Sequence, residues 1–260
     1  MPEPMAGQNG PGTIVITGTG LYTPPESISN AELVASLSAA TDLWNTEHGD
    51  EIAAGQLIAR ANPDETFILK ASGIRSRYVV DKDGVLDPKR LRPHLRLRSE
   101  DELGLQAEFS LPAVHQALEM AGRVGRDVDA IIVGCSNLER AYPAVSIEIQ
   151  AAIGARGWAY DMNVACSSAT FSMQAAADAL RSGSANCVVV VNPEITSGHN
   201  NFELRDFHFI FGDACTALVL ERAGEESRDA GTSAAGVHSA PSLNGDRWAI
   251  RGSRLATQFS

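Results

Sequence analysis

The sequence lacks the features that mark three broad classes of protein. Lys and Arg number 21 against 32 Asp and Glu, a net charge of -11, so there is no cationic excess for a nucleic acid backbone. No apolar run is long enough to span a bilayer. The N-terminus has no basic segment followed by an apolar one, as a signal peptide requires. We therefore expect a cytoplasmic protein with no nucleic acid and no membrane partner.

Cysteine is scarce, and the four cysteines are far apart in the sequence. None of the four cysteines forms a C-x-x-C pair, so their spacing predicts neither a zinc site nor a redox dithiol. Cys135, Cys187 and Cys215 lie in or beside apolar runs, which predicts core positions. The glycines at 18 and 20 have no third glycine or P-loop lysine after them, which indicates a turn and not a phosphate loop. No metal and no cofactor are expected.

Apolar runs without polar alternation recur along the chain. Such runs predict strands that are buried on both faces, because a strand with one solvated face alternates. Strands are expected at 13–17, 130–133 and 185–191, and helices at 64–72, 100–122 and 144–153. Polar residues 38–62 are interpreted as an insertion that carries helix. This order predicts an α/β domain with a mainly parallel sheet that helices cover on both faces.

The stretch 159–180 contains the candidate nucleophile. Cys166 follows the end of a predicted buried strand, and Ser167 and Ser168 follow as N-cap candidates for a helix predicted to be buried on several sides. A thiol at a helix N-terminus is placed where the helix dipole stabilises a thiolate. Alternatively, Cys166 is a small buried hydrophobe, as most structural cysteines are. The residues alone leave both interpretations open.

Several short motifs occur in a specific order. The chain has SGIRSR at 72–77, the pair Tyr142-Pro143, DMNVACS at 161–167 and FGDA at 211–214. Together they resemble the β-ketoacyl-[acyl-carrier-protein] synthase III family of the thiolase superfamily, over roughly residues 13–240. The resemblance implies an α/β fold of the thiolase-like layered αβαβα type, with the N-terminal half and the start of the C-terminal half present.

The same resemblance implies a homodimeric acyltransferase with two substrates, acyl-CoA and malonyl-acyl carrier protein. Cys166 would carry the acyl group, and its own backbone N–H would form half of an oxyanion hole. Tyr142 falls where the family's partner subunit closes the acyl pocket. Phe67 falls where an aromatic residue stacks on the CoA adenine, and Lys70 and Arg75 are weaker candidates for the CoA phosphates.

The sequence also departs from the family. Its nucleophile block reads Cys-Ser-Ser, where the family more often has Cys-Ser-Gly, and Gly198 replaces an arginine that binds CoA. The decarboxylating His and Asn of the second half have no counterpart before Ser260, so we expect the natural protein to be longer or its gene to be truncated.

The expected organisation is a disordered lead-in at 1–12, an N-terminal half at 13–222, and a linker with the start of a C-terminal half at 223–260. Two alternatives remain open for function. One is a related acyltransferase of secondary metabolism, and the other is a catalytically incomplete scaffold half.

Overall fold

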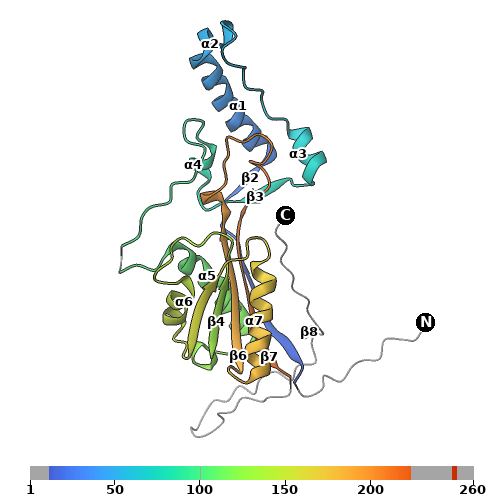
Figure 1. Cartoon of the computed structure of the whole chain (residues 1–260), viewed down its shortest axis with the longest axis vertical. Helices are drawn as coiled ribbons and strands as arrows, with labels where there is room; N and C mark the ends of the chain where they lie inside the picture. Colours follow the sequence, from blue (N-terminus) through green and yellow to red (C-terminus); the bar gives the residue numbers. More distant parts are fainter. Residues whose placement is uncertain (1–11, 100, 224–247, 251–260) are drawn as a thin grey trace, which may run out of the picture. The chain divides into compact units, whose positions relative to one another are not determined.

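The computed structural model describes residues 12–99, 101–223 and 248–250, which form two compact units (Figure 1). The first unit contains residues 12–22, 101–193, 215–223 and 248–250, and the second contains 23–99 and 194–214. The predicted lead-in at 1–12 lies outside the described residues except for Gly12, and only residues 223 and 248–250 of the predicted segment 223–260 are described.

The first unit is built on a six-stranded sheet with the order β5-β4-β6-β7-β1-β8. Its strands are β1 (Ile14–Tyr22), β4 (Ala130–Gly134), β5 (Trp158–Met162), β6 (Cys187–Ile195), β7 (Asp213–Arg222) and β8 (Trp248–Ile250). The prediction of an α/β domain is confirmed.

The prediction of a mainly parallel sheet is only half right. β4 pairs in parallel with β5 and β6, whereas β1 pairs antiparallel with β7 and β8. The connection from β6 to β7 explains part of this difference. Residues 196–212 contain a single turn of 3-10 helix, η2 (Thr196–Gly198), and no α-helix of the kind that a parallel crossover normally uses.

Three helices cover the sheet of the first unit. They are α5 (Leu105–Ala121), α6 (Val145–Ile153) and α7 (Ser168–Ser182), and the 3-10 turn η1 (Gly125–Asp127) follows α5. Helix α7 lies on one face of the sheet, and α5 and α6 lie on the other (Figure 1). Within the described residues, no helix combines the length and the apolar character needed to cross a membrane.

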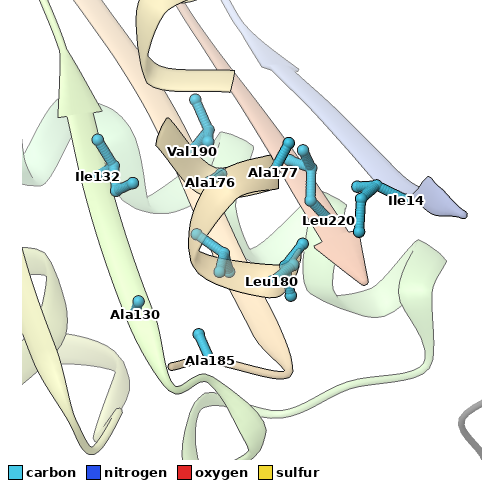
Figure 2. Packing of buried hydrophobic residues seen from close by; sticks show 10 residues of the cluster. Ile14, Ala130, Ile132, Ala176, Ala177, Leu180, Ala185, Val190 and Leu220 are labelled. Atoms are coloured by element: carbon cyan, nitrogen blue, oxygen red, sulfur yellow. The ribbon is translucent and has the colours of Figure 1, made fainter. Parts of the chain in front are cut away.

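Small side chains bring α7 close to the sheet. Ala176, Ala177 and Leu180 pack on a buried layer of strand residues (Figure 2). The strand residues of this layer that face the helix are Ile14, Ala130, Ile132, Val188, Val190 and Leu220. Each fully buried Val, Leu or Ile contributes roughly 1.5–3 kcal/mol relative to an exposed one, so this layer is a major source of stability.

The prediction that α7 is buried on several sides is wrong for the described chain. Its buried positions form one face, and Phe171 and Met173 are only half-buried. The physical reason is the distribution of side-chain size. The Ser and Ala positions approach the sheet closely, while no described element packs over the opposite side of the helix.

The second unit has its own core. Its elements are β2 (Ser27–Ser29), α1 (Asn30–Glu47), α2 (Gly49–Ala53), α3 (Glu65–Ser72), β3 (Ser76–Tyr78), α4 (Lys82–Leu86) and η2. The insertion at 38–62 carries the end of α1 and all of α2, as predicted. The core gathers Ile28, Leu33, Leu37, Ile68, Val79, Val85, Leu91, Phe202 and Phe209.

Gly20 provides a test of how closely β1 and α5 pack. A Cβ atom at this position would lie 1.9 Å from the Ala113 backbone oxygen, so something must shift. We expect Gly20→Ala to lower the free energy of unfolding by about 1–3 kcal/mol, the usual cost of overpacking. Urea denaturation followed by circular dichroism measures this change. The control is Gly49→Ala, where a Cβ meets nothing within 4 Å, and equal midpoints for the two variants would contradict the prediction.

Candidate active site

Cys166 lies on the turn between β5 and α7, and it is the exposed one of the four cysteines. Cys135, Cys187 and Cys215 are buried, as predicted, and the alternative that Cys166 is a buried hydrophobe is wrong. Burial raises the pKa of Cys215 to about 12 and raises the pKa of Cys187 well above its usual range. The structure therefore presents one thiol to reagents and keeps two others protonated.

Two side chains hold the turn that carries Cys166. Ala165 has a φ of 47°, a left-handed conformation that costs a non-glycine residue about 1–2 kcal/mol. The Ser168 hydroxyl accepts from the Val164 N–H at 2.9 Å and donates to the Ala165 carbonyl at 2.7 Å. The Asn163 side chain accepts from the Ala165 N–H at 2.9 Å and donates to the Ser136 carbonyl at 2.8 Å.

The backbone N–H groups of this turn are nearly all used inside it. The N–H of Ser167 donates to the Val164 carbonyl at 3.0 Å, and that of Ser168 donates to the Ala165 carbonyl at 3.1 Å. With the Val164 and Ala165 N–H groups bound to side chains, the N–H of Cys166 is left without a hydrogen bond to any described residue. The turn thus presents a thiol and a backbone donor from the same residue.

The predicted serine cap takes a different form. Ser167 occupies the N-cap position of α7, but its side chain makes no capping hydrogen bond. Ser168, the first residue of the helix, instead folds its hydroxyl back onto the turn. The residue type was predicted correctly, while its role was not, because the left-handed residue at 165 brings Val164 within reach of Ser168.

The end of β4 packs against the turn and supports it. A Cβ at Gly134 would lie 2.7 Å from the Ser168 carbonyl oxygen and 2.9 Å from the Asn192 side-chain nitrogen, so only glycine fits. Asn192 donates to the Gly134 carbonyl at 2.7 Å. Sequence reasoning missed Gly134, Asn163 and Asn192. Their shared signal is a small or polar residue at the end of a predicted parallel strand, where side chains of neighbouring strands meet.

Tyr142 is 87% exposed and precedes α6 through a cis peptide bond to Pro143. The start of α6 is tied to β5, because Asp161 accepts from the N–H groups of Val145 and Ser146 at 2.8 and 2.9 Å. A carboxylate at this place satisfies helix donors that would otherwise be unpaired. Tyr142 therefore stands on an anchored segment of the first unit.

The three CoA candidates belong to the second unit. Phe67 and Lys70 lie on α3, and Arg75 lies just after it. Phe67 is 42% exposed and makes an edge-to-face contact with Phe209, with ring centroids 6.0 Å apart. Lys70 and Arg75 are exposed. Cys166 and Tyr142 are residues of the first unit, so the structure places the predicted site residues in two separately described sets.

Charged residues of two motifs are structural anchors. Arg77, the second arginine of SGIRSR, is 5% exposed and donates to the Ile28 carbonyl and the Asn30 side chain at 3.0 and 2.6 Å. Burial lowers its pKa to about 10, which still leaves it charged at neutral pH. Asp213 of FGDA accepts from the N–H of Val80 and from both the N–H and hydroxyl of Ser197 at 2.6–2.8 Å.

Comparison with known proteins identifies the relatives of this chain. The model of the 3-oxoacyl-[acyl-carrier-protein (ACP)] synthase III family matches residues 160–239, which include the Cys166 turn. The chain is 54% identical over 180 residues to the β-ketodecanoyl-[acyl-carrier-protein] synthase of Pseudomonas aeruginosa, covering 69% of this chain and 51% of the relative. It is 29% identical over 226 residues to the β-ketoacyl-[acyl-carrier-protein] synthase III of Acidiphilium cryptum, covering 86% and 57%.

Solved structures show the same fold. The chain matches the 3-oxoacyl-[acyl-carrier-protein] synthase III of Aquifex aeolicus with a TM-score of 0.59 and 22% identity, over 82% of this chain and 55% of that one. It matches the priming β-ketosynthase of the R1128 polyketide biosynthetic pathway with a TM-score of 0.62 and 22% identity, over 85% and 53%. The predicted thiolase-like fold is confirmed, and the chain spans about half the length of the relatives it matches.

The exposure of Cys166 generates a labelling prediction. We expect the native chain to take up one iodoacetamide, at Cys166, because the other three thiols are inaccessible. Intact mass and peptide mapping measure the uptake. The Cys166→Ala variant should take up none in the same time, and denatured wild-type protein should take up four. Rapid native labelling of Cys187 or Cys215 would contradict the structure.

Proposed function

Because the chain belongs to the 3-oxoacyl-[acyl-carrier-protein] synthase III family, we propose that it carries the nucleophile of an acyltransferase that condenses an acyl group with malonyl-acyl carrier protein in fatty acid biosynthesis. The observation that carries the proposal is the turn at Cys166. It presents an exposed thiol together with an N–H that has no hydrogen-bond partner among the described residues.

The proposed reaction begins with acyl loading. The Cys166 thiolate attacks the carbonyl carbon of an acyl-CoA, a C–S bond to Cys166 forms, and CoA leaves as its thiol after taking up a proton. The negative charge that develops on the carbonyl oxygen in this step is stabilised by the Cys166 N–H. Such a donor accelerates the reaction because it is most favourable when the charge is fully developed.

Condensation follows loading. Malonyl-acyl carrier protein loses carbon dioxide, and the resulting carbanion attacks the acyl group on Cys166. The C–S bond then breaks, and a β-ketoacyl group remains on the carrier protein. We assign named residues of this chain to the loading step only, because the groups that stabilise the carbanion have no counterpart in the matched motifs.

The relative from Pseudomonas aeruginosa bears on the length of the acyl group. It is named for a β-ketodecanoyl product, which has ten carbons, and condensation with malonyl adds two of them. Its loading group is then an eight-carbon acyl chain. We propose the same medium-chain preference here, on the strength of the 54% identity to this relative.

The remaining site residues are proposed to bind the substrate. Phe67 offers a half-exposed ring for the CoA adenine, and Lys70 and Arg75 offer exposed cations for its phosphates. Tyr142 is proposed to contact the acyl chain held by a partner subunit. Its 87% exposure on an anchored segment supports a role at an interface, because a large aromatic side chain is seldom left in water.

We further propose a cytoplasmic homodimer that pairs at β5. This strand lies at the edge of the sheet, with β4 as its one neighbour in the described chain. Trp158 and Tyr160 stack on it with ring centroids 5.8 Å apart, and Tyr160 is 38% exposed. An unpaired edge with apolar side chains favours strand pairing with another chain. All four cysteines are free thiols, which supports a reducing compartment.

The loading step predicts a donor preference. We expect octanoyl-CoA to acylate Cys166 about tenfold or more faster than acetyl-CoA, because each buried methylene contributes roughly 0.8 kcal/mol. Intact mass against time measures both rates. Cys166→Ala should accept neither group, whereas Cys187→Ala, the same substitution at a buried thiol, should still load. Loading of the Cys166→Ala variant at the wild-type rate would end the proposal.

Pairing at β5 predicts an effect on assembly. We expect a dimer for the wild-type chain and a monomer for Tyr160→Glu, since like charges facing each other across paired strands repel. Analytical ultracentrifugation distinguishes the two states. Val124→Glu places the same charge at a 50% exposed apolar position of the first unit outside β5, and it should remain dimeric. A monomeric wild type at every concentration would refute the interface.

A further inference from the structure

Ser168 connects the buried start of α7 to the exposed nucleophile. It is 2% exposed, whereas Cys166, two residues earlier, is exposed. Its hydroxyl and its N–H both donate to the Ala165 carbonyl, at 2.7 and 3.1 Å. The same hydroxyl accepts from the Val164 N–H at 2.9 Å. This residue is also the one at which the nucleophile block departs from Cys-Ser-Gly.

The orientation of one peptide group follows from these bonds. The Ala165 carbonyl and the Cys166 N–H belong to the same planar, trans peptide, so they point in opposite directions. Two hydrogen bonds from Ser168 draw the carbonyl toward the helix. The Cys166 N–H must then point away from α7. Fixing one end of a rigid group fixes the other.

We propose that Ser168 is a positioning residue that holds the Cys166 N–H as an oxyanion donor. The inference rests on the proposed function, in that it assumes an acyl-transfer intermediate at Cys166. Ala165 is left-handed, so an unrestrained turn would relax by rotating this peptide. The Ser168 hydroxyl opposes that rotation directly, at the carbonyl of this peptide. Asn163 holds the preceding peptide through the Ala165 N–H at 2.9 Å, so the turn cannot relax by moving that peptide instead.

The hydroxyl has no proton left to donate to a substrate in this arrangement. Its one proton is donated to the Ala165 carbonyl, and one of its lone pairs accepts from Val164. It therefore acts on the reaction through the peptide that it orients. Ser172 offers the matched comparison, because it is fully buried one turn later, and its hydroxyl donates only to the Ala169 carbonyl, at 2.9 Å.

The test compares two reagents that attack the same thiol. Acetylation by p-nitrophenyl acetate passes through a tetrahedral oxyanion, whereas alkylation by iodoacetamide does not. In Ser168→Ala we expect acetylation to slow by about tenfold or more and alkylation to stay within about twofold, because losing an oxyanion donor affects only the first reaction. Ser172→Ala should leave both rates unchanged. Intact mass on the full chain measures both, with Cys166→Ala as the background.

Three results would overturn the inference. They are an unchanged ratio of the two rates in Ser168→Ala, an equal fall in both rates, and an equal fall of the ratio in Ser172→Ala. If Ser168→Ala does not fold, Asn163→Ala decides the matter. This substitution removes the side chain that accepts from the Ala165 N–H, and Asn163 is exposed. It should lower the ratio of the acetylation rate to the alkylation rate, as Ser168→Ala does.

The same measurements separate this inference from the proposed function. The proposed function would be refuted if p-nitrophenyl acetate acetylated the wild-type chain but no acyl-CoA loaded it. In that case the ratio of the acetylation and alkylation rates in Ser168→Ala would still test the role of Ser168. A wild-type Cys166 that iodoacetamide alkylates but that p-nitrophenyl acetate fails to acetylate would overturn the inference itself, because no oxyanion donor would then be operating.

Discussion

The planarity of the peptide between Ala165 and Cys166 is the constraint on which the site depends. A strand that ends beneath a helix must reverse within a few residues, and here it does so through a left-handed alanine. The reversal is stable because hydrogen bonds occupy the turn from both sides. Ser168 binds the carbonyl of this peptide, so the N–H of Cys166, at the other end of the same peptide, is directed away from α7. The backbone geometry of the turn therefore sets the direction of the N–H beside the Cys166 thiol.

The packing of α7 on the sheet serves the same turn. Gly134 has no side chain, which lets the Ser168 carbonyl approach β4, and Asn192 closes the end of that strand. Ala176 and Ala177 keep the helix close along its length. A larger residue at any of these positions would push the helix outward, because protein cores have little free volume. The turn would then lose its support, although Cys166 itself had not changed.

The second unit shows how a motif can hold structural residues. Arg77 and Asp213 belong to segments that resemble family motifs, and both are buried and hydrogen-bonded to backbone groups or short polar side chains. Removing either would leave buried polar groups unpaired, which costs about 1–3 kcal/mol for each. The exposed residues beside them, such as Phe67 and Arg75, are the ones available to a ligand. Within the SGIRSR motif, burial therefore distinguishes Arg77, which stabilises the fold, from Arg75, which is exposed to a ligand.

The sequence by itself determined the place of Cys166 between a strand and a helix, the core cysteines, the main strands and the family resemblance, because apolar runs, turn residues and ordered motifs are local signals. Tertiary structure alone decided the antiparallel pairing of β1 with β7, the half-buried outer face of α7 and the hydrogen bonds of Ser168 to the turn. These depend on partners distant in the chain or on the direction of one peptide. Asn163 reaches Ser136, and Gly134 meets Ser168. A linear pattern records which residues are present, but hydrogen-bond direction exists only once the chain has folded.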